Sequence, residues 1–452
     1  MMKRCLVFGI FVLFLTLREG LSTAESSPIT GTLSEIDRLL TLNKRAERGR
    51  VLRLFQKLFQ TFRKLYKRSY NPNESGGRFR QFVQAVKMIL SVNKQGYEFK
   101  AEINKFTDMT EEEKSANTGV NASEYLMFAE REGEGGEDGT WANLQRRLKE
   151  GPETLDWVAE GKTLKPLEQG DCASCWAMAT VGAVEGRYAI ATGKLKRFSV
   201  QELVDCTYEY TGANTGCNGG WFTKSYKYMK TGGHLTLASD LPYVANDGAC
   251  KAGSLPNGFK AASLTAWKQE KNPTFDQMVV AIQDGPVSVG IKAQGDFFQY
   301  GTGIYFNPTC STDLNHGLVG VGYSPKYIIL RNSWGYDWGQ GGYVYFTRTH
   351  GNVCGVTSYM VYGTWTPNGG TDDDPDGIPE SAAGVCRDLD PAECGEYGLI
   401  GCSDPVTSNF MKINCRFTCK ICTVPQGDDD CPPGEIKCGA ECKEKHLCEH
   451  HG

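Results

Sequence analysis

The spacing of apolar residues changes along the chain and predicts helices first and strands later. Residues 25 to about 110 interleave charged and apolar positions at helical spacing, so this region is expected to be α-helical. An apolar, Ala-rich run from Cys175 to Gly193 predicts a buried helix that begins at the cysteine. Later apolar runs have the length and residue types of strands. They cover Pro286–Ile291, Leu318–Tyr323, Tyr327–Leu330 and Tyr343–Thr347.

Polar and targeting segments divide the chain into modules. A basic pair, an apolar run and small residues predict a signal peptide over residues 1–24, with an apolar run too short to span a bilayer. A polar connection runs from Glu111 to Gly151, and its acidic, Gly-rich part is expected to be mobile and open to proteolysis. Residues 366–384 form a Gly/Pro/Asp linker. The modules between these breaks are residues 25–151, 152–365, 385–422 and 423–452.

Charge and cysteine content narrow the class of protein. A formal charge of −4 and a pI near 6.0 give no electrostatic reason to expect nucleic acid or a membrane surface as partner. No segment after the signal peptide predicts a membrane span, so a soluble, exported protein with paired cysteines is expected. Of the 18 cysteines, Cys5 leaves with the signal peptide, which leaves 17. If all others pair, one thiol stays free and is a candidate for reactivity.

Four residues form a pattern suited to nucleophilic catalysis. Cys175 begins the predicted helix, where the partial positive charge of the N-terminus favours a thiolate. His316 opens a Gly/Val-rich strand and can hold the thiolate as an ion pair, and Asn332 can fix the imidazole tautomer. Gln169 lies six residues before Cys175 and can donate to an oxyanion. At this point Cys172 and Cys175 also fit a zinc or thioredoxin-type pair.

Three segments of the chain, in their order, resemble the papain and cathepsin L family of cysteine endopeptidases. They are Gln-Gly-x-Cys-x-Ser-Cys-Trp, Asn-His-Gly and Asn-Ser-Trp-Gly. The resemblance implies an α+β fold with a helical left domain, a β-barrel-like right domain and the active site between them. It implies that Cys175 is the nucleophile, His316 its acid–base partner, Asn332 the orienting group and Gln169 the oxyanion donor. Ala173 departs from the family, which has glycine there.

The resemblance also implies disulfide pairs and substrate contacts. The pairs in the central module are Cys172–Cys217, Cys206–Cys250 and Cys310–Cys354, which leaves Cys175 free and argues against the zinc and dithiol alternatives. Gly219 and Gly220 are expected to pair with the backbone of extended substrate. Asn315 and Trp334 are also expected to bind substrate. The S2 specificity pocket is expected to accept medium to bulky apolar side chains. Its expected lining is Trp221, Phe222, Gly290, Leu314, Gly317 and Tyr359. Alternatively, Trp221 and Tyr359 are aromatic residues of the core.

The N-terminal module resembles the inhibitory propeptide of the cathepsin L subgroup. Its residues follow two motifs of that family, the first along one helix face. They are Glu74, Arg78, Phe82, Ile89 and Asn93, followed by Asn104, Phe106 and Asp108. Ala85 and Glu102 depart from the usual asparagine and glycine. The carboxylates of Asp108 and Glu74 suggest release of the propeptide in acid. Glycosylation sequons lie at Asn73 and Asn121.

The tail resembles the six-cysteine (ShK-type) domain of sea-anemone potassium-channel toxins. The implied pairs are Cys386–Cys422, Cys394–Cys415 and Cys402–Cys419. Asn409 and Phe410 replace the Lys-Tyr dyad of the toxins, which argues against channel block. The last four cysteines predict two small disulfides, with a metal site near His446, His450 and His451 as the alternative; they are Cys431, Cys438, Cys442 and Cys448.

The sequence therefore predicts a secreted or lysosomal cysteine endopeptidase made as a zymogen. The expected partners are protein or peptide substrates and its own propeptide; no cofactor, metal, nucleic acid or membrane span is expected, and the protein is expected to be a monomer. Two other functions stay open. One is a secreted binding protein that keeps the protease scaffold without turnover, and the other is a toxin-like effector carried by the protease.

Overall fold

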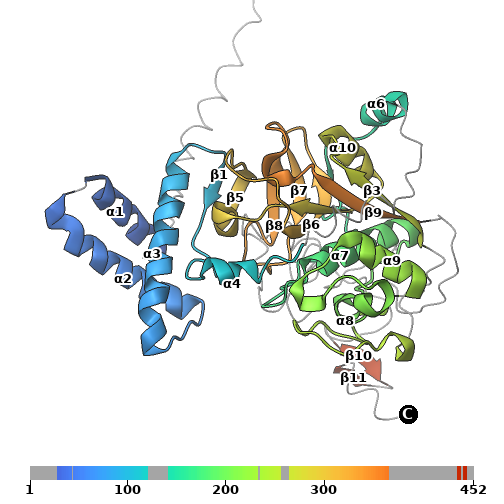
Figure 1. Ribbon diagram of the computed structural model, residues 1–452, viewed down its shortest axis with the longest axis horizontal. Helices are drawn as coiled ribbons and strands as arrows, with labels where there is room; N and C mark the ends of the chain where they lie inside the picture. Colours follow the sequence, from blue (N-terminus) through green and yellow to red (C-terminus); the bar gives the residue numbers. More distant parts are fainter. Residues whose placement is uncertain are drawn as a thin grey trace, which may run out of the picture. The chain divides into compact units, whose positions relative to one another are not determined.

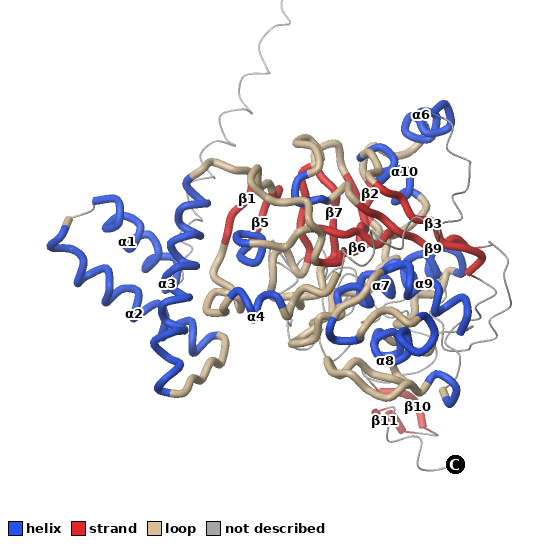
Figure 2. Tube along the Cα trace, in the orientation of Figure 1, coloured by secondary structure: helices blue, strands red, loops and turns tan. Residues whose placement is uncertain are grey.

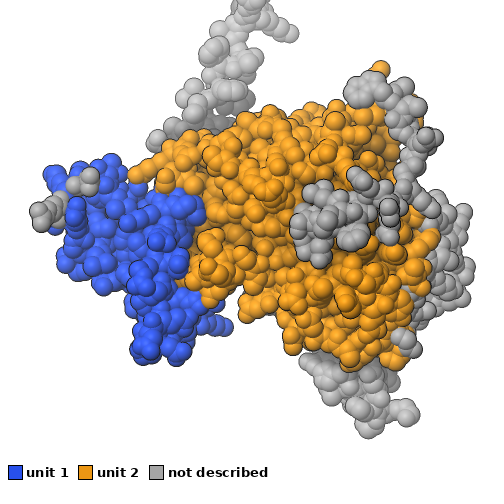
Figure 3. All heavy atoms as spheres, in the orientation of Figure 1, with its two compact units in different colours: residues 1–90 blue, residues 91–452 orange. Residues whose placement is uncertain are grey.

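The computed structural model describes residues 28–42, 44–120, 141–232, 235–255, 264–365, 435–438 and 441–444. The chain divides into two compact units, residues 1–90 and residues 91–452, which are coloured separately in Figure 3. Within the described residues, no helix is both long enough and apolar enough to cross a membrane. The six-cysteine module, its linker, the signal segment and Asn121 lie outside the described residues.

The first unit consists of helices, as the sequence predicts. It contains α1 (Pro28–Leu42), a short 3-10 turn, α2 (Arg48–Leu65) and most of α3 (Pro72–Lys94). Apolar residues at helical spacing on α2 and α3 form its core, in which Phe82 packs 5.1 Å from Phe59 and 5.0 Å from Phe62, measured between ring centroids. On α3, Glu74 pairs with Arg78 at 2.7 Å.

The second unit combines helices with a nine-stranded sheet (Figures 1 and 2). The strand order is β1-β5-β8-β7-β6-β4-β9-β3, and β2 pairs with β6. The strands that the sequence predicts are β4 (Val287–Ile291), β6 (His316–Tyr323), β7 (Tyr327–Arg331) and β8 (Tyr343–Thr347). The others are β1 (Phe99–Ala101), β2 (Leu155–Asp156), β3 (Leu264–Lys271), β5 (Tyr300–Tyr305) and β9 (Tyr359–Trp365). A separate hairpin joins β10 (Glu435–Cys438) and β11 (Glu441–Glu444).

Helices of the second unit pack together on one side of this sheet, as Figure 1 shows for α7, α8 and α9. They are α7 (Cys175–Thr192), α8 (Val200–Thr211) and α9 (Phe222–Gly232); α4 (Glu111–Ser115), α6 (Trp141–Glu150) and α10 (Phe275–Gln283) lie elsewhere in this unit. Helix α7 is buried almost all round, as its apolar run predicts, and contacts β6, β9 and β4. It ends at Gly193, whose left-handed φ of 72° closes the helix.

One prediction for the N-terminal module is wrong. The region predicted to be helical up to about residue 110 contains the strand β1, which pairs with the edge strand β5. The side-chain amide of Asn93 fastens β1 by donating to the Ala101 carbonyl (2.9 Å) and accepting from the Ala101 N–H (2.8 Å). The predicted polar connection from Glu111 to Gly151 holds the short helix α4 and the helix α6, and its acidic, Gly-rich part lies outside the described residues. Tertiary pairing, which local periodicity does not register, determines the conformation here.

Candidate active site

Cys175 is the first residue of α7 and lies fully buried. Among the cysteines that the structure describes between residues 141 and 365, it is the one without a disulfide. The other six form Cys172–Cys217, Cys206–Cys250 and Cys310–Cys354. Because Cys172 is bonded to Cys217, it is not available as a metal ligand or redox partner for Cys175.

His316 begins strand β6 beside Cys175. The two segments touch, since a Cβ added to Gly317 would lie 3.0 Å from the Cys175 carbonyl oxygen. The His316 Nε2 lies 2.7 Å from Asn332 Oδ1. Asn332 Oδ1 also accepts from the Ser333 N–H at 2.8 Å, so it is an acceptor and Nε2 carries a hydrogen. His316 Nδ1 is buried and makes no hydrogen bond with the described residues, which leaves it for proton transfer. The Trp334 ring stacks on the imidazole at 4.5 Å.

The Gln169 side chain is held in one orientation by neighbours from both sides of the site. Its Nε2 donates to the Cys172 carbonyl (2.8 Å), and its Oε1 accepts from Ser333 Oγ (2.7 Å). The Gln169 backbone N–H also donates to the Ser333 carbonyl at 2.9 Å. The second hydrogen of Nε2 is thus available to a ligand. A continuous chain of hydrogen bonds runs from His316 through Asn332 and Ser333 to Gln169.

Residues 117–120 of the N-terminal module cross over this site. The Gly119 N–H donates to the Asn315 carbonyl (2.9 Å), and the Gly119 carbonyl accepts from the Gly220 N–H (2.8 Å). Val120 forms a parallel bridge with Gly220. A Cβ at position 119 would lie 1.8 Å from the Ala173 carbonyl oxygen, so only glycine fits this close approach. The segment therefore occupies the space directly beside Cys175.

Burial sets the protonation of Cys175 and His316 in this closed state. Desolvation raises the pKa of the Cys175 thiol to about 12, although the backbone amides of Gly317 and Gly119 work in the opposite direction. Desolvation also lowers the pKa of His316 to about 4, against the effect of its hydrogen bond with Asn332. Sulfur is therefore a neutral thiol near pH 7, and the favourable effect of the helix N-terminus on the thiolate is outweighed by burial.

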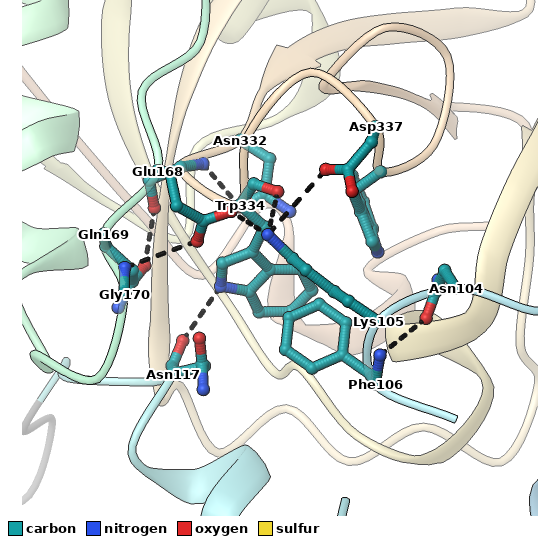
Figure 4. A network of polar contacts seen from close by, with 12 residues as sticks. Asn104, Lys105, Phe106, Asn117, Glu168, Gln169, Gly170, Asn332, Trp334 and Asp337 are labelled. Carbon is teal, nitrogen blue, oxygen red and sulfur yellow. Dashed lines mark hydrogen bonds and ion pairs between the residues drawn. The ribbon is translucent and has the colours of Figure 1, made fainter. Parts of the chain in front are cut away.

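Lys105 joins residues from two sides of the site, as Figure 4 shows. Its Nζ donates to the Trp334 carbonyl at 2.6 Å, forms a salt bridge with Glu168 and lies 3.9 Å from Asp337 Oδ1. The Lys105 side chain is 16% exposed, whereas those of Glu168 and Asp337 are 46% and 59% exposed. We call Lys105, Glu168 and Asp337 the Lys105 cluster. It connects the propeptide segment to the residues next to Gln169 and Asn332.

Replacing Lys105 by Met is expected to weaken the attachment of this segment by about 1–2 kcal/mol. A charge-assisted hydrogen bond and a largely exposed ion pair are lost together. Processing of the full-length chain at pH 7 should then accelerate roughly 5- to 30-fold, measured as the rate at which the band of the intact chain disappears. Lys100→Met on the exposed face of β1 removes the same charge and should process at the wild-type rate. Equal rates for both variants would contradict a role of this cluster.

The second motif of the N-terminal module packs against the indole ring of Trp334. Phe106 lies 4.8 Å from the Trp334 ring and 5.3 Å from the Phe298 ring. Asn104 Nδ2 donates to the Phe298 carbonyl at 2.7 Å, and Asp108 is 1% exposed. The Trp334 Nε1 donates to the Asn117 carbonyl at 3.1 Å. Trp334 is thus covered by the segment that leads to Gly119.

The residues expected to line the S2 pocket lie near one another. Trp221 is 4.7 Å from Tyr359 and 5.2 Å from Phe222 between ring centroids, and all three are buried. The Leu314 side chain faces Gly290, because a Cβ added there would lie 2.8 Å from Leu314 Cδ1. Gly219 has a φ of 113°, a conformation that favours glycine. The burial of all three rings fits the core interpretation as well as the pocket interpretation.

Comparison with known proteins settles the family. Residues 151–364 match the family model described as papain family cysteine protease, residues 59–113 match the cathepsin propeptide inhibitor domain, and residues 385–422 match the ShK domain-like model. The chain is 34% identical over 316 residues to a vignain from Vigna mungo, covering 68% of this chain and 84% of that protein. The chain belongs to the papain family of cysteine proteases.

Further similar proteins include solved structures of proenzymes. Cathepsin S of Mus musculus is 38% identical over 217 residues, or 47% of this chain and 63% of that protein. A structure of a recombinant stem bromelain precursor has a TM-score of 0.60 at 28% identity, covering 69% of this chain and 99% of that one. Procathepsin L2 from Tenebrio molitor has a TM-score of 0.57 at 27% identity, covering 69% and 99%. The predicted fold and the inhibitory propeptide are confirmed, and this chain is a cysteine peptidase zymogen.

Sequence reasoning missed several residues of this protease site. Gly119 lies in the predicted polar connection, where its only signal is that a glycine precedes an apolar residue. Ser333 lies inside the Asn-Ser-Trp-Gly segment, but nothing in the sequence indicates that it holds Gln169. Lys105 lies between two motif residues of the propeptide. Hydrogen bonds between segments far apart in the chain create these roles, and local patterns do not encode them.

Ala173 is expected to restrict the substrate residue beside the nucleophile. A Cβ at position 119 would lie 2.9 Å from the Ala173 Cβ, so the methyl group limits the space that Gly119 fills. Ala173→Gly should raise kcat/KM about tenfold for peptides with leucine, relative to glycine, on the acyl side of the scissile bond. The control varies the next residue of the peptide toward its N-terminus (P2), and the preference there should be the same for both enzymes. An unchanged leucine-to-glycine ratio would contradict this role.

Proposed function

We propose that this protease is a secreted or lysosomal endopeptidase in which Cys175, His316, Asn332 and Gln169 carry out hydrolysis and residues 117–120 maintain latency. The observation that carries this proposal is the crossing of Gly119 over the buried Cys175, with hydrogen bonds to Asn315 and Gly220. Main-chain groups that pair with an extended inhibitory segment are suited to pair with an extended substrate once that segment leaves.

The proposed reaction follows from the positions of two hydrogens, one on the Cys175 sulfur and one on His316 Nε2. After the segment leaves, the proton of the Cys175 thiol moves to His316 Nδ1, giving a thiolate–imidazolium pair. Sulfur attacks the scissile carbonyl, and the oxyanion accepts from Gln169 Nε2 and the Cys175 N–H. The imidazolium then protonates the leaving amine, and an acyl-enzyme remains. His316 next takes a proton from water, which attacks the thioester; the acid product leaves and Cys175 is regenerated. Asn332 holds the ring through Nε2.

Acid release of the propeptide is assigned to carboxylates rather than to the catalytic pair. In the closed state the pair holds one proton, on sulfur, from about pH 4 to about pH 12. An open thiolate–imidazolium pair also holds one proton between about pH 4 and neutral pH. The pair therefore contributes little to pH dependence between pH 5 and 7. The exposed carboxylates of Glu168 and Asp337, which face Lys105, are the proposed groups for this release, and the hydrogen bond from Lys105 to the Trp334 carbonyl does not depend on them. Buried Asp108 is a further candidate for a carboxylate that triggers release in acid. Glu74 is a weaker candidate, because its ion pair with Arg78 is exposed.

An apolar residue is proposed to occupy S2, beside the rings of Trp221, Phe222 and Tyr359, which contact one another. Gly290 and Gly317 allow Leu314 and Phe222, respectively, to approach the backbone closely. The experiment incubates the purified proform at pH 4.5 and pH 7, sequences the new N-terminus and profiles cleavage on a peptide library. Faster processing in acid, a start near Pro152–Trp157 and a preference for leucine or phenylalanine at P2 are expected. Equal processing at both pH values would contradict acid release of the propeptide. A preference for arginine at P2 would contradict an apolar S2 pocket.

A binding or toxin-like function is the alternative. The complete hydrogen-bonded chain from His316 to Gln169 favours turnover over a retained scaffold. The six-cysteine module lies outside the described residues, so its pairs, Asn409 and Phe410 stay predictions. Expression of residues 385–452 alone is expected to leave potassium currents unchanged. Current block by this fragment would support the toxin alternative.

A further inference from the structure

We infer that Tyr243 is a positioning residue that joins the two donors of the oxyanion hole. This inference rests on the proposed roles of Gln169 and Cys175. The Tyr243 hydroxyl lies 2.8 Å from the Gln169 carbonyl oxygen and 2.6 Å from Ser174 Oγ. Gln169 supplies one oxyanion donor through its side chain. Ser174 directly precedes Cys175, whose backbone N–H is the other donor.

The direction of both hydrogen bonds follows from the groups involved. A carbonyl oxygen only accepts, so the Tyr243 O–H donates to Gln169. The phenol has a single hydrogen, and its oxygen must therefore accept from the Ser174 hydroxyl. Ser174 is the N-cap residue of α7, yet its side chain makes no capping hydrogen bond. An N-cap hydroxyl usually accepts a hydrogen bond from a backbone N–H in the first turn of its helix. The Ser174 hydroxyl instead binds Tyr243 and makes no such bond to the backbone N–H groups near Cys175.

The segment that carries Tyr243 is itself fixed to the start of α8. Ser199 Oγ donates to the Leu241 carbonyl at 2.7 Å. Gln201 accepts from the Val244 N–H at 3.0 Å and donates to the Asn246 carbonyl at 2.7 Å. Ser199 and Gln201 are 0% and 2% exposed. Buried polar groups therefore hold the chain on both sides of Tyr243, and its hydroxyl has a defined position from which to orient two other segments.

The same segment also contacts the Gln169 turn directly. A Cβ added to Gly170 would lie 3.3 Å from the Ala245 Cβ, and Gly170 has a φ of 60°. The turn after Gln169 therefore packs against Ala245 while the phenol holds the carbonyl of Gln169 itself. The Gln169 side chain is held by Cys172 and Ser333, and its backbone N–H donates to the Ser333 carbonyl, so Tyr243 adds the restraint on the Gln169 carbonyl. A small displacement of this backbone would move Nε2 relative to the Cys175 N–H.

Tyr243→Phe removes the oxygen that links the two segments and keeps the ring. Because the oxyanion forms on the way to the acyl-enzyme, kcat for amide hydrolysis should fall about tenfold with KM within twofold. Complete loss of one oxyanion donor costs about 10²- to 10³-fold, and a misplaced donor should cost less. The rate of Cys175 alkylation by iodoacetamide should stay within twofold, since this reaction forms no oxyanion.

Tyr300→Phe is a matched control. The Tyr300 hydroxyl also donates to a carbonyl, that of Gly303, and accepts from a side chain, that of Gln340. It lies on β5 and contacts neither Gln169 nor Ser174 through these bonds. In acid-processed enzyme, titrated for active sites, Tyr300→Phe should keep the wild-type kcat. Thermal unfolding of both variants reports any general loss of stability.

A double-mutant cycle with Gln169→Ala gives the decisive readout. If Tyr243 acts through Gln169, Tyr243→Phe should cost less than twofold in kcat when Gln169 is already alanine. A full tenfold loss in that background, an equal fall in alkylation rate or an unchanged kcat in the single variant would overturn the inference. Absence of hydrolysis by the wild-type enzyme would instead contradict the proposed function.

Discussion

Replacing Gly119 by Val is expected to make the unprocessed chain active at pH 7. A Cβ at position 119 would lie 1.8 Å from a backbone oxygen of Ala173, and backbone in this turn cannot move aside as a flexible side chain can. The hydrogen bonds to Asn315 and Gly220 would then be lost with the close approach. Overpacking of this kind costs about 3 kcal/mol, which weakens closure about 150-fold.

The measurement is the initial rate of peptide hydrolysis by full-length protein, recorded before any cleavage appears on a gel. Gly49→Ala is the matched control because its added Cβ would meet no atom within 3.7 Å on helix α2. That control should stay latent at pH 7. If the Gly119→Val chain also stayed latent until it was cut, residues 117–120 would not be the segment that blocks the site.

Replacing Cys175 by Ala is expected to abolish both hydrolysis and self-processing. The thiol is the proposed nucleophile, and removing such a group lowers kcat by about 10⁵- to 10⁶-fold. The variant should remain at full length in acid, and catalytic amounts of processed wild-type enzyme should cut it at the wild-type site. The three disulfides of the central module do not involve Cys175, so its fold should be retained.

Thermal unfolding and reaction with wild-type enzyme separate loss of chemistry from loss of structure. A folded Cys175→Ala chain that still processed itself in acid would show that another group performs the reaction. A variant that unfolds at a much lower temperature would be replaced by Cys175→Ser, which keeps a polar side chain of similar size. Its expected loss of kcat is of the same order.

The residues of the candidate site could be proposed from sequence because the chemistry of a cysteine nucleophile requires particular residue types in a particular order. A cysteine at the start of a buried helix, a histidine opening a strand and an asparagine after the next strand restrict the possibilities strongly. Helix α7 was predicted from the apolar run and Gly193, since a helix buried all round shows both features in sequence. The strands β4, β6, β7 and β8 were also predicted from their apolar runs.

The rest could not be predicted because it depends on contacts between distant segments. Strand β1 exists because it pairs with β5, and its own three residues carry no clear strand signal. Gly119 gains its role from Ala173, Asn315 and Gly220, which lie 54 to 196 positions away in the sequence. Tyr243 is similarly defined by Gln169 and Ser174. The thiol protonation is also a tertiary property, since burial by the propeptide opposes the helix N-terminus.

The most direct test of the account is the labelling of Cys175 before and after removal of the propeptide. Proform at pH 7 and acid-processed enzyme returned to pH 7 are each treated with iodoacetamide, and the peptide containing Cys175 is quantified by mass spectrometry. The account predicts slow modification of the proform, where the thiol is buried and its pKa is raised to about 12, and rapid modification in step with activity after processing. Equal labelling of Cys175 in both forms, or activity without a reactive Cys175, would contradict it.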